Sequence, residues 1–557
     1  MKERLKMKKV FSKLFLLAVC LTMVLSACAP KPTPTATATP APVTQPPVVV
    51  PTATQPPAPT EIAPADIELW ASGRVTEAAP PPDDWIAYTK IKDELKVNLK
   101  LVLLPSTQSD QDTKINAAAA SNSLPDVFFV SRDTWFKLVG AGLIAKVDDL
   151  LPLMPVRTAS HYSDPDRNRL VTVDGAMYGL PDPGAMPMTD GLVIRQDWLD
   201  KLGLKAPTTT DEFLTVAKAF TNDDPDGNGK KDTYGFCAFV DGSGLTAMGV
   251  GPRFDWVYGA FGVAGIFDLS SAANFGLNVR KDAYMQATQF IRTLNEEGVI
   301  DPDWPTLKKD EFRARWKQGS CGMMHENFAA LSTQSNYKAF DENFPNGFWS
   351  VLVPPKGPNG DSADGTVILS ARIYAISQRA IDAGKGPAIA RLLEWMANDE
   401  GYYLLGFGEK GVNYNLDANG NITLDGLPDP AKAWTKAEMQ PLTQLANMVY
   451  IFTPVELNAR YPSYTAASGR QMDPLSYYTS FTKQPYTQAT GSAIVNPPSN
   501  AADFTRFYSE NIAKFVLGQE PLNADTWAAF ITGLDGLGAK DLETNAKQTL
   551  MSAGFLE

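Results

Sequence analysis

The sequence has little of what most catalytic sites need. Its 557 residues contain two histidines, His161 and His325, and four cysteines. It has no H-E-x-x-H pair, no C-x-x-C pair, no G-x-S-x-G elbow and no G-x-x-x-x-G-K-[ST] phosphate loop. Aspartates and glutamates are so numerous that no two can be singled out as the acid and base of a glycosidase. These absences favour binding over catalysis.

Long apolar runs are also missing. The longest, at residues 14–24, is shorter than the roughly 20 residues that span a bilayer. Basic residues precede it and LSAC (25–28) follows, which is typical of a secretory signal and resembles a bacterial lipobox. The resemblance implies cleavage before Cys28 and lipidation of that thiol with palmitate; the alternative is a plain cleavage site beside a free cysteine. Residues 1–27 are therefore predicted to be a lipoprotein signal peptide.

Residues 28–65 are dominated by Pro and Thr and offer few large apolar groups for a core. We expect a semi-rigid tether that holds the remaining chain outside the bacterial cell membrane, with the lipid as its only membrane contact. The net charge of −12 argues against nucleic acid as a partner, because phosphates are bound by Lys and Arg. Cys237 and Cys321 remain after processing. They either pair or stay as two buried thiols, and spacing alone does not decide.

Beyond the tether, strand and helix patterns alternate. Strands are predicted at 67–70, 97–102 and 126–130, and helices at 85–95, 112–121 and 133–143. This order predicts an α/β fold with a mostly parallel sheet. The length suggests two or three domains.

Five segments resemble one family in its own order: GAMYGLP (175–181), IRQDWLDKLGL (194–204), WKQGSCGMM (316–324), FGEKGVNYNLDANGNI (407–422) and the C-terminal 508–538. They are similar to the extracellular solute-binding proteins (family 1) of bacterial ABC sugar importers, in the lipoprotein branch of alginate- and oligosaccharide-binding proteins. The resemblance implies a monomer with two discontinuous α/β lobes, a hinge, and a ligand in the cleft between them. We expect lobes of 66–185 with 325–374, and of 186–324 with 375–557, the final helices being able to pack across both.

A sugar site needs aromatic platforms and polar groups, here expected where strands end or chains cross. For each candidate the alternative is a packed core aromatic or a structural ion pair. The ligand-binding candidates are Trp70, Arg74, Arg132, Trp135, Tyr178, Asp182, Trp256, His325, Glu326, Asn327, Arg372 and Tyr374.

The stretch NDDPDGNGKKDTYG (222–235) has oxygen-bearing residues at the spacing of a calcium loop. Gly235 stands where an EF-hand has its bidentate glutamate, and a strand pattern follows. The resemblance implies a structural calcium loop, although Thr233 replaces the family's usual glutamate; the alternative is an Asx-rich turn without an ion. The expected ligands are Asp224, Asp226, Asn228 and Asp232 by side chain and Lys230 by its carbonyl.

Two functions follow. The first is a membrane-anchored solute-binding protein that captures an oligosaccharide and delivers it to the permease subunits of an ABC importer. The alternative is a surface-anchored glycan hydrolase or lyase. The shortage of histidine and of nucleophile motifs favours the first.

Overall fold

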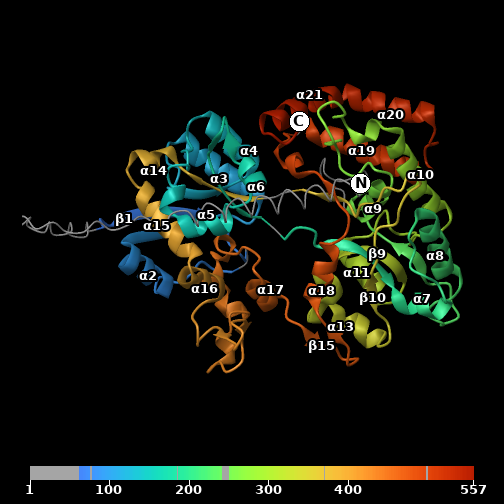
Figure 1. Cartoon of the computed structure of the whole chain (residues 1–557), viewed down its shortest axis with the longest axis horizontal. Helices are drawn as coiled ribbons and strands as arrows, with labels where there is room; N and C mark the ends of the chain where they lie inside the picture. Colours follow the sequence, from blue (N-terminus) through green and yellow to red (C-terminus); the bar gives the residue numbers. More distant parts are fainter. Residues whose placement is uncertain (1–61, 76–77, 185, 241–249, 369–370, 497–499) are drawn as a thin grey trace, which may run out of the picture. The chain divides into compact units, whose positions relative to one another are not determined.

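Two β-sheets, each covered by helices, organise this chain (Figure 1). The computed structural model describes residues 62–557, except 76–77, 185, 241–249, 369–370 and 497–499. The predicted signal peptide, Cys28 and nearly all of the tether lie outside the described residues. Within the described part, no helix is long and apolar enough to cross a membrane.

The first sheet is mostly built from the N-terminal third of the chain. Its strands, in spatial order, are β2 (Val97–Leu103), β1 (Ala65–Ala71), β3 (Val127–Val130), β12 (Ala371–Ile376) and β6 (Leu180–Pro183). Strands β1, β2 and β3 are parallel, whereas β12 is antiparallel to β3 and β6. Helices α2 (Ile86–Leu95), α3 (Gln108–Ala120) and α4 (Arg132–Gly140) connect and follow the parallel strands. The alternation predicted from the sequence is therefore confirmed.

Local chemistry explains these elements. Strand β1 alternates, burying Ile67, Leu69 and Ala71 on one face, as a period of two requires. Helices α3 and α4 begin after Thr107 and Ser131, whose hydroxyl oxygens accept backbone N–H groups of the first turn.

The second sheet has the spatial order β10 (Trp349–Val351), β7 (Asp190–Arg195), β9 (Cys321–Asn327) and β8 (Tyr234–Cys237). A disulfide joins Cys237 to Cys321 on the neighbouring strands β8 and β9, which decides between the two alternatives left open by their spacing. The covering helices include α7 (Gln196–Leu202), α8 (Thr210–Asn222), α9 (Asp255–Ala260), α10 (Asp282–Glu296), α19 (Ala501–Val516) and α20 (Ala524–Gly536).

The expected boundaries at 325 and 374 are wrong. Strand β9 runs through 325 within the second sheet, and α12 (Phe328–Ser332) and α13 (Gln334–Asn343) pack beside it, so 325–367 does not belong with the first sheet. Conversely, α15 (Gly386–Ala397) and the segment up to Tyr450 contribute to the first core.

The chain thus passes between the sheets three times. The first passage lies between Pro183 and Asp190 and contains the expected boundary between 185 and 186. The second lies between β11 (Thr366–Val367) and β12, and the third follows Tyr450. The last helix, α21 (Ala539–Ser552), packs against the second core and also places Leu550 in a small cluster with Leu170.

Candidate ligand-binding site

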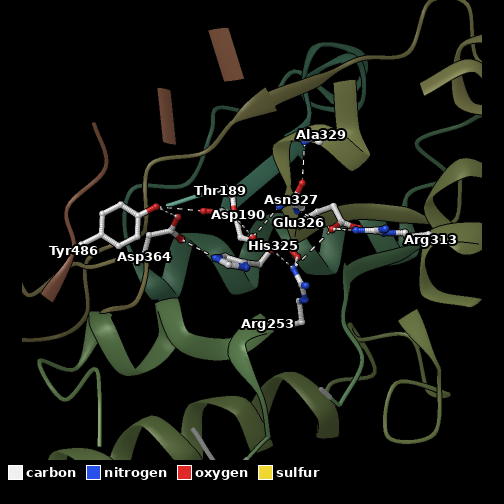
Figure 2. Close-up of polar contacts among 10 residues, drawn as sticks. All are labelled: Thr189, Asp190, Arg253, Arg313, His325, Glu326, Asn327, Ala329, Asp364 and Tyr486. Carbon is white, nitrogen blue, oxygen red and sulfur yellow. Dashed lines mark hydrogen bonds and ion pairs between the residues drawn. The ribbon is translucent and has the colours of Figure 1, made fainter. Parts of the chain in front are cut away.

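A cavity of about 670 Å³ opens where β7 begins and β9 ends. The two strands are antiparallel, with Asp190 opposite Asn327 and Leu192 opposite His325, so the start of one strand meets the end of the other. Arg253 is supplied by the 3-10 helix η2 (Pro252–Phe254), while Asp364 and Tyr486 come from the segments just before β11 and β17 (Thr487–Gln488). Figure 2 shows these side chains converging on the strand ends.

The two arginines of this cavity are engaged by the protein's own oxygens (Figure 2). Arg253 Nη1 donates to Asp190 Oδ1 at 3.0 Å and to the carbonyl of His325 at 2.7 Å. Arg313, from α11 (Lys309–Lys317), donates through Nε and Nη2 to the two carboxylate oxygens of Glu326, each at 3.1 Å. Burial would raise the pKa of Asp190, but the charge of Arg253 holds it below its ordinary value.

Several buried groups of the same cavity make no hydrogen bond among the described residues. Asp364 is 2% exposed and His325 is 5% exposed, and neither Asp364 Oδ1 nor a ring nitrogen of His325 makes one. The two side chains face each other, with His325 Nε2 3.6 Å from Asp364 Oδ1 (Figure 2). Asp255 Oδ1 is likewise buried and unpaired. A buried polar group without a partner costs free energy, so these atoms suit a ligand that supplies hydrogen-bonding groups.

Burial also sets the charge of these groups. It raises the pKa of Asp364 well above its ordinary value and that of Asp255 to about 7. Burial and then the charge of Arg253 lower the pKa of His325 to about 4, so its imidazole is neutral near pH 7.

A second cavity, of about 420 Å³, adjoins the first, because Thr189 and Asn327 line both. Its aromatic and cationic lining comes mainly from the segments that follow β1 and η6 (Ala446–Met448). These side chains are Arg74, Arg372, Arg460, Tyr450, Phe452, Phe328 and Tyr461.

Four of the twelve predicted ligand-binding residues line one of these two cavities: Arg74, His325, Asn327 and Arg372. Trp70, Arg132 and Tyr178 line neither. Trp70 Nε1 donates to Glu68, and Arg132 lies over the Trp135 ring, 4.5 Å from its centroid. The carbonyl of Tyr178 accepts a hydrogen bond from Trp135 Nε1.

The other five also line neither cavity, because their side chains are buried in the core. Asp182 is paired with Arg157, and Glu326 with Arg313. Trp256 packs on Phe213, with ring centroids 4.4 Å apart. These five fully buried residues are Trp135, Asp182, Trp256, Glu326 and Tyr374.

Sequence reasoning missed Asp190, Arg253, Asp364, Tyr486 and Arg460. Asp190 lies at the first passage between the sheets, so its position near an expected crossing could have suggested a ligand-binding role. Asp364 and Tyr486 precede two-residue strands that carry no periodicity. Pairing between such distant segments leaves no local signal in the sequence.

The loop at 224–232 is organised around Asp224 and Asn228. Asp224 Oδ1 accepts the N–H groups of Gly227 and Asn228, and its Oδ2 that of Gly229, all at 3.1 Å. Asn228 Nδ2 donates to Asp226 at 2.7 Å and to Asp232 at 3.1 Å. Burial, with the nearby charges of Asp232 and Asp224, raises the pKa of Asp226.

In the part of the chain that the structure describes, no three Asp, Glu, His or Cys side chains converge as a metal-binding group. A calcium ion at this loop would therefore depend on the Asn228 amide oxygen and the Lys230 carbonyl as well. The donor types, three carboxylates and these two oxygens, are those that a calcium ion takes, although the carboxylates do not converge on one point in the described structure.

The family model described as bacterial extracellular solute-binding protein matches residues 83–403. Two curated relatives are similar. The polygalacturonan/rhamnogalacturonan-binding protein YtcQ of Bacillus subtilis (strain 168) is 25% identical over 375 residues, covering 66% of this chain and 70% of the relative. The fructooligosaccharide ABC transporter substrate-binding protein FusA of Streptococcus pneumoniae serotype 4 is 27% identical over 390 residues, covering 64% and 67%.

Solved structures share the fold. A solute-binding protein associated with an HMO-binding ABC transporter, from Bifidobacterium longum infantis, has a TM-score of 0.65 at 19% identity, covering 89% of this chain and all (100%) of that one. The alginate-binding protein AlgQ2 without calcium ion has a TM-score of 0.56 at 18% identity, covering 87% and 98%. The expected two-lobed α/β fold is thereby confirmed.

Proposed function

Because the chain belongs to the bacterial extracellular solute-binding proteins, we propose that it captures an oligosaccharide in the two adjoining cavities and delivers it to an ABC importer. The family and its fold neighbours bind solutes for transport and are not enzymes. The hydrolase or lyase alternative has no support from them. Among the relatives, YtcQ and FusA are named for saccharide ligands.

The observation that carries the proposal is the set of buried, unpaired groups on the 670 Å³ cavity. Asp364 Oδ1 and the ring nitrogens of His325 make no hydrogen bond among the described residues, and His325 Nε2 and Asp364 Oδ1 lie 3.6 Å apart. A sugar hydroxyl both donates and accepts, so one pyranose ring can satisfy several such groups at once. Aromatic rings in the adjoining cavity offer apolar faces for sugar C–H groups.

Thermal melting of the purified protein against a panel of oligosaccharides tests the proposal. We expect a saturable rise in Tm with one class of oligosaccharide and recovery of that ligand intact. Asp364→Asn should weaken binding about tenfold or more, since an NH2 group replaces one of the two buried carboxyl oxygens.

Asp361→Asn is the matched control, because Asp361 is exposed, lies in the same segment and lines neither cavity. Its affinity should equal that of the unaltered protein. Cleavage of any oligosaccharide, or no response to the whole panel, would contradict the proposed function.

We also propose that the protein is a monomeric lipoprotein on the outer side of the cell membrane, tethered through Cys28 and residues 28–65. The Cys237–Cys321 disulfide supports an extracytoplasmic location, because such bonds persist in oxidising compartments. Blocking lipoprotein signal processing should make the precursor accumulate, and Cys28→Ala should release the protein from membranes. Membrane retention of Cys28→Ala would refute the anchor.

A structural calcium ion at the 224–232 loop is a further part of the proposal. The clustered oxygens of Asp224, Asp226, Asn228, Lys230 and Asp232 support it. Calcium should raise Tm relative to EDTA, and Asp226→Ala should abolish the difference.

Asp417→Ala is the control for the calcium experiment, because Asp417 organises a comparable turn by accepting the N–H groups of Asn419 and Asn421. The calcium response should survive in that variant. A response that is unchanged in Asp226→Ala, or absent from the unaltered protein, would leave the loop as an Asx-rich turn.

A further inference from the structure

The 420 Å³ cavity concentrates positive charge on a protein whose net charge is −12. Three arginines, Arg74, Arg372 and Arg460, line it, and none of the described lining residues is Asp or Glu. On an acidic chain, three guanidinium groups around one cavity are not explained by average composition. They lower the free energy of an anion placed among them.

Arg372 has a positive charge that no ion pair among the described residues balances. Its Nη1 donates to the carbonyl of Pro183 at 2.7 Å, and it forms no ion pair with any described residue. Its cross-strand neighbour Asp182 is already bound by Arg157 through both carboxylate oxygens. Burial lowers the pKa of Arg372, Tyr374 and Asp182 oppose this shift, and the charge of Arg460 adds to it. A partly buried cation without an ion pair is stabilised when a ligand provides a counter-ion.

Arg74 and Arg460 complete the arrangement. Arg74 Nη1 donates to the hydroxyl of Thr443 at 2.9 Å, a neutral partner, and no described residue forms an ion pair with it. Arg460 is the exception, since Glu456 accepts a hydrogen bond from its Nη1 at 2.8 Å. Its guanidinium lies 5.2 Å from the centroid of the Tyr450 ring.

The two cavities therefore differ in chemistry. In the 670 Å³ cavity, Arg253 and Arg313 are bound by Asp190 and Glu326, the cation without a described ion pair is the exposed Lys309, and the buried groups without a hydrogen bond include Oδ1 of Asp364. In the 420 Å³ cavity, the groups without ionic partners are cations. One ligand that reaches both, past Thr189 and Asn327, would meet acceptors at one end and guanidinium groups at the other.

We propose that the ligand is an acidic oligosaccharide, with a sugar carboxylate held by Arg372 and Arg74 and an adjoining hydroxyl-rich ring held in the 670 Å³ cavity. The inference rests on the proposed function and specifies its substrate class. A carboxylate matches the planar fork of a guanidinium and takes two parallel hydrogen bonds from it. The rings of Tyr450 and Tyr461 flank the same cavity and suit the apolar face of the sugar that bears the acid.

Isothermal titration with galacturonate oligomers of two to four residues, and with the same oligomers methyl-esterified, tests the charge directly. The two probes differ in charge and not in ring structure. We expect the free acids to bind at least tenfold more tightly than the esters, with an affinity that falls as salt is added. Equal or tighter binding of the esters would overturn the inference.

Arg372→Gln and Arg74→Gln should each reduce the preference for the free acid to about threefold or less. Arg506→Gln, which removes an exposed arginine outside both cavities, should retain the full preference. Arg372→Lys keeps the charge without the fork and should be intermediate, and the Tm of each variant shows that it is folded. Unchanged preference in folded Arg372→Gln and Arg74→Gln would overturn the assignment.

Two further outcomes separate this inference from the proposed function. Tight binding of a neutral oligosaccharide with no binding of galacturonates would overturn the acidic ligand and leave the solute-binding role intact. If a sulfated disaccharide binds more tightly than digalacturonate, the arginines recognise a sugar sulfate, and the proposal of a sugar carboxylate is overturned. A protein that binds no saccharide of any class would refute the proposed function as well.

Discussion

Arg157 Nη2 lies 2.8 and 2.7 Å from the two carboxylate oxygens of Asp182, and neither side chain is exposed. Arg157 Nε also donates to the hydroxyl of Tyr162 at 2.7 Å. The pair lies beside the second cavity's Arg372 in the sheet register, yet it belongs to the core. A buried ion pair of this kind is costly to break, because the surviving partner is left charged and desolvated.

Asp182→Ala is therefore expected to lower the free energy of unfolding by about 3–5 kcal/mol. Guanidinium-induced denaturation measures it. Asp166→Ala, which removes the exposed ion pair with Arg169, is the matched control and should cost about 1 kcal/mol or less. Similar losses in both variants would contradict the structural assignment of Asp182.

Trp256→Ala should act on stability and not on affinity. The side chain is fully buried against Phe213 and Phe236, so its loss leaves a cavity that costs about 3–5 kcal/mol. Chemical denaturation gives the stability, and titration of the folded protein gives the affinity. A tenfold loss of oligosaccharide affinity in folded Trp256→Ala would restore this residue to the site.

Replacing both cysteines of the Cys237–Cys321 disulfide by serine should destabilise the protein by about 4 kcal/mol, because the bond closes a loop with a sequence separation of 84. Reductant should lower the Tm of the unaltered protein and leave that of the double variant unchanged. Insensitivity of both proteins to reductant would indicate that the bond does not constrain the unfolded chain.

Asp255 should make stability fall between about pH 4 and pH 7. Its pKa is about 7 in the folded protein and near 4 when unfolded, so the folded state binds more protons across that interval. Raising the pH then favours the unfolded state. Asp255→Asn removes this contribution, and its unfolding free energy should decline less over the same interval in denaturation series at fixed pH steps.

The opposite slope is expected from His325, whose pKa falls to about 4 on folding. The unfolded state binds more protons between about pH 4 and 6.5, so this residue alone makes stability rise with pH there. His325→Gln should remove that rise. Parallel pH profiles for the His325 and Asp255 variants would contradict the assigned pKa directions.

Much of the fold was predictable because its signals are local. The alternation in β1, the apolar run in β3 and the capping hydroxyls each act within a few residues. Thr209 is an example, because its hydroxyl oxygen accepts the N–H of Glu212 at 3.2 Å at the start of α8. By contrast, nothing near Ala371–Ile376 indicates that β12 inserts between β3 and β6, because that placement depends on distant pairing.

The site was less predictable for a related reason. Trp135 and Trp256 carry the residue type that sugar sites use, but a large aromatic is equally suited to a core, and here the core holds both. Arg74 was predicted because it follows the first strand, and Arg372 because it lies near the expected second crossing between the lobes. Asp364 and Tyr486 owe their position to contacts between segments far apart in the chain.

The position of β12 also constrains how the protein can be made. Strand β6 borders β12 and no other strand of the first sheet, so β6 has no edge to join until residue 376 has been synthesised. A product truncated at Val367 would contain every strand of the second sheet while leaving β3 and β6 with open edges, which are prone to aggregation. The first sheet is therefore complete only after β12 has been made, and the second core only after α19 and α20, so a chain ending at Val367 lacks parts of both.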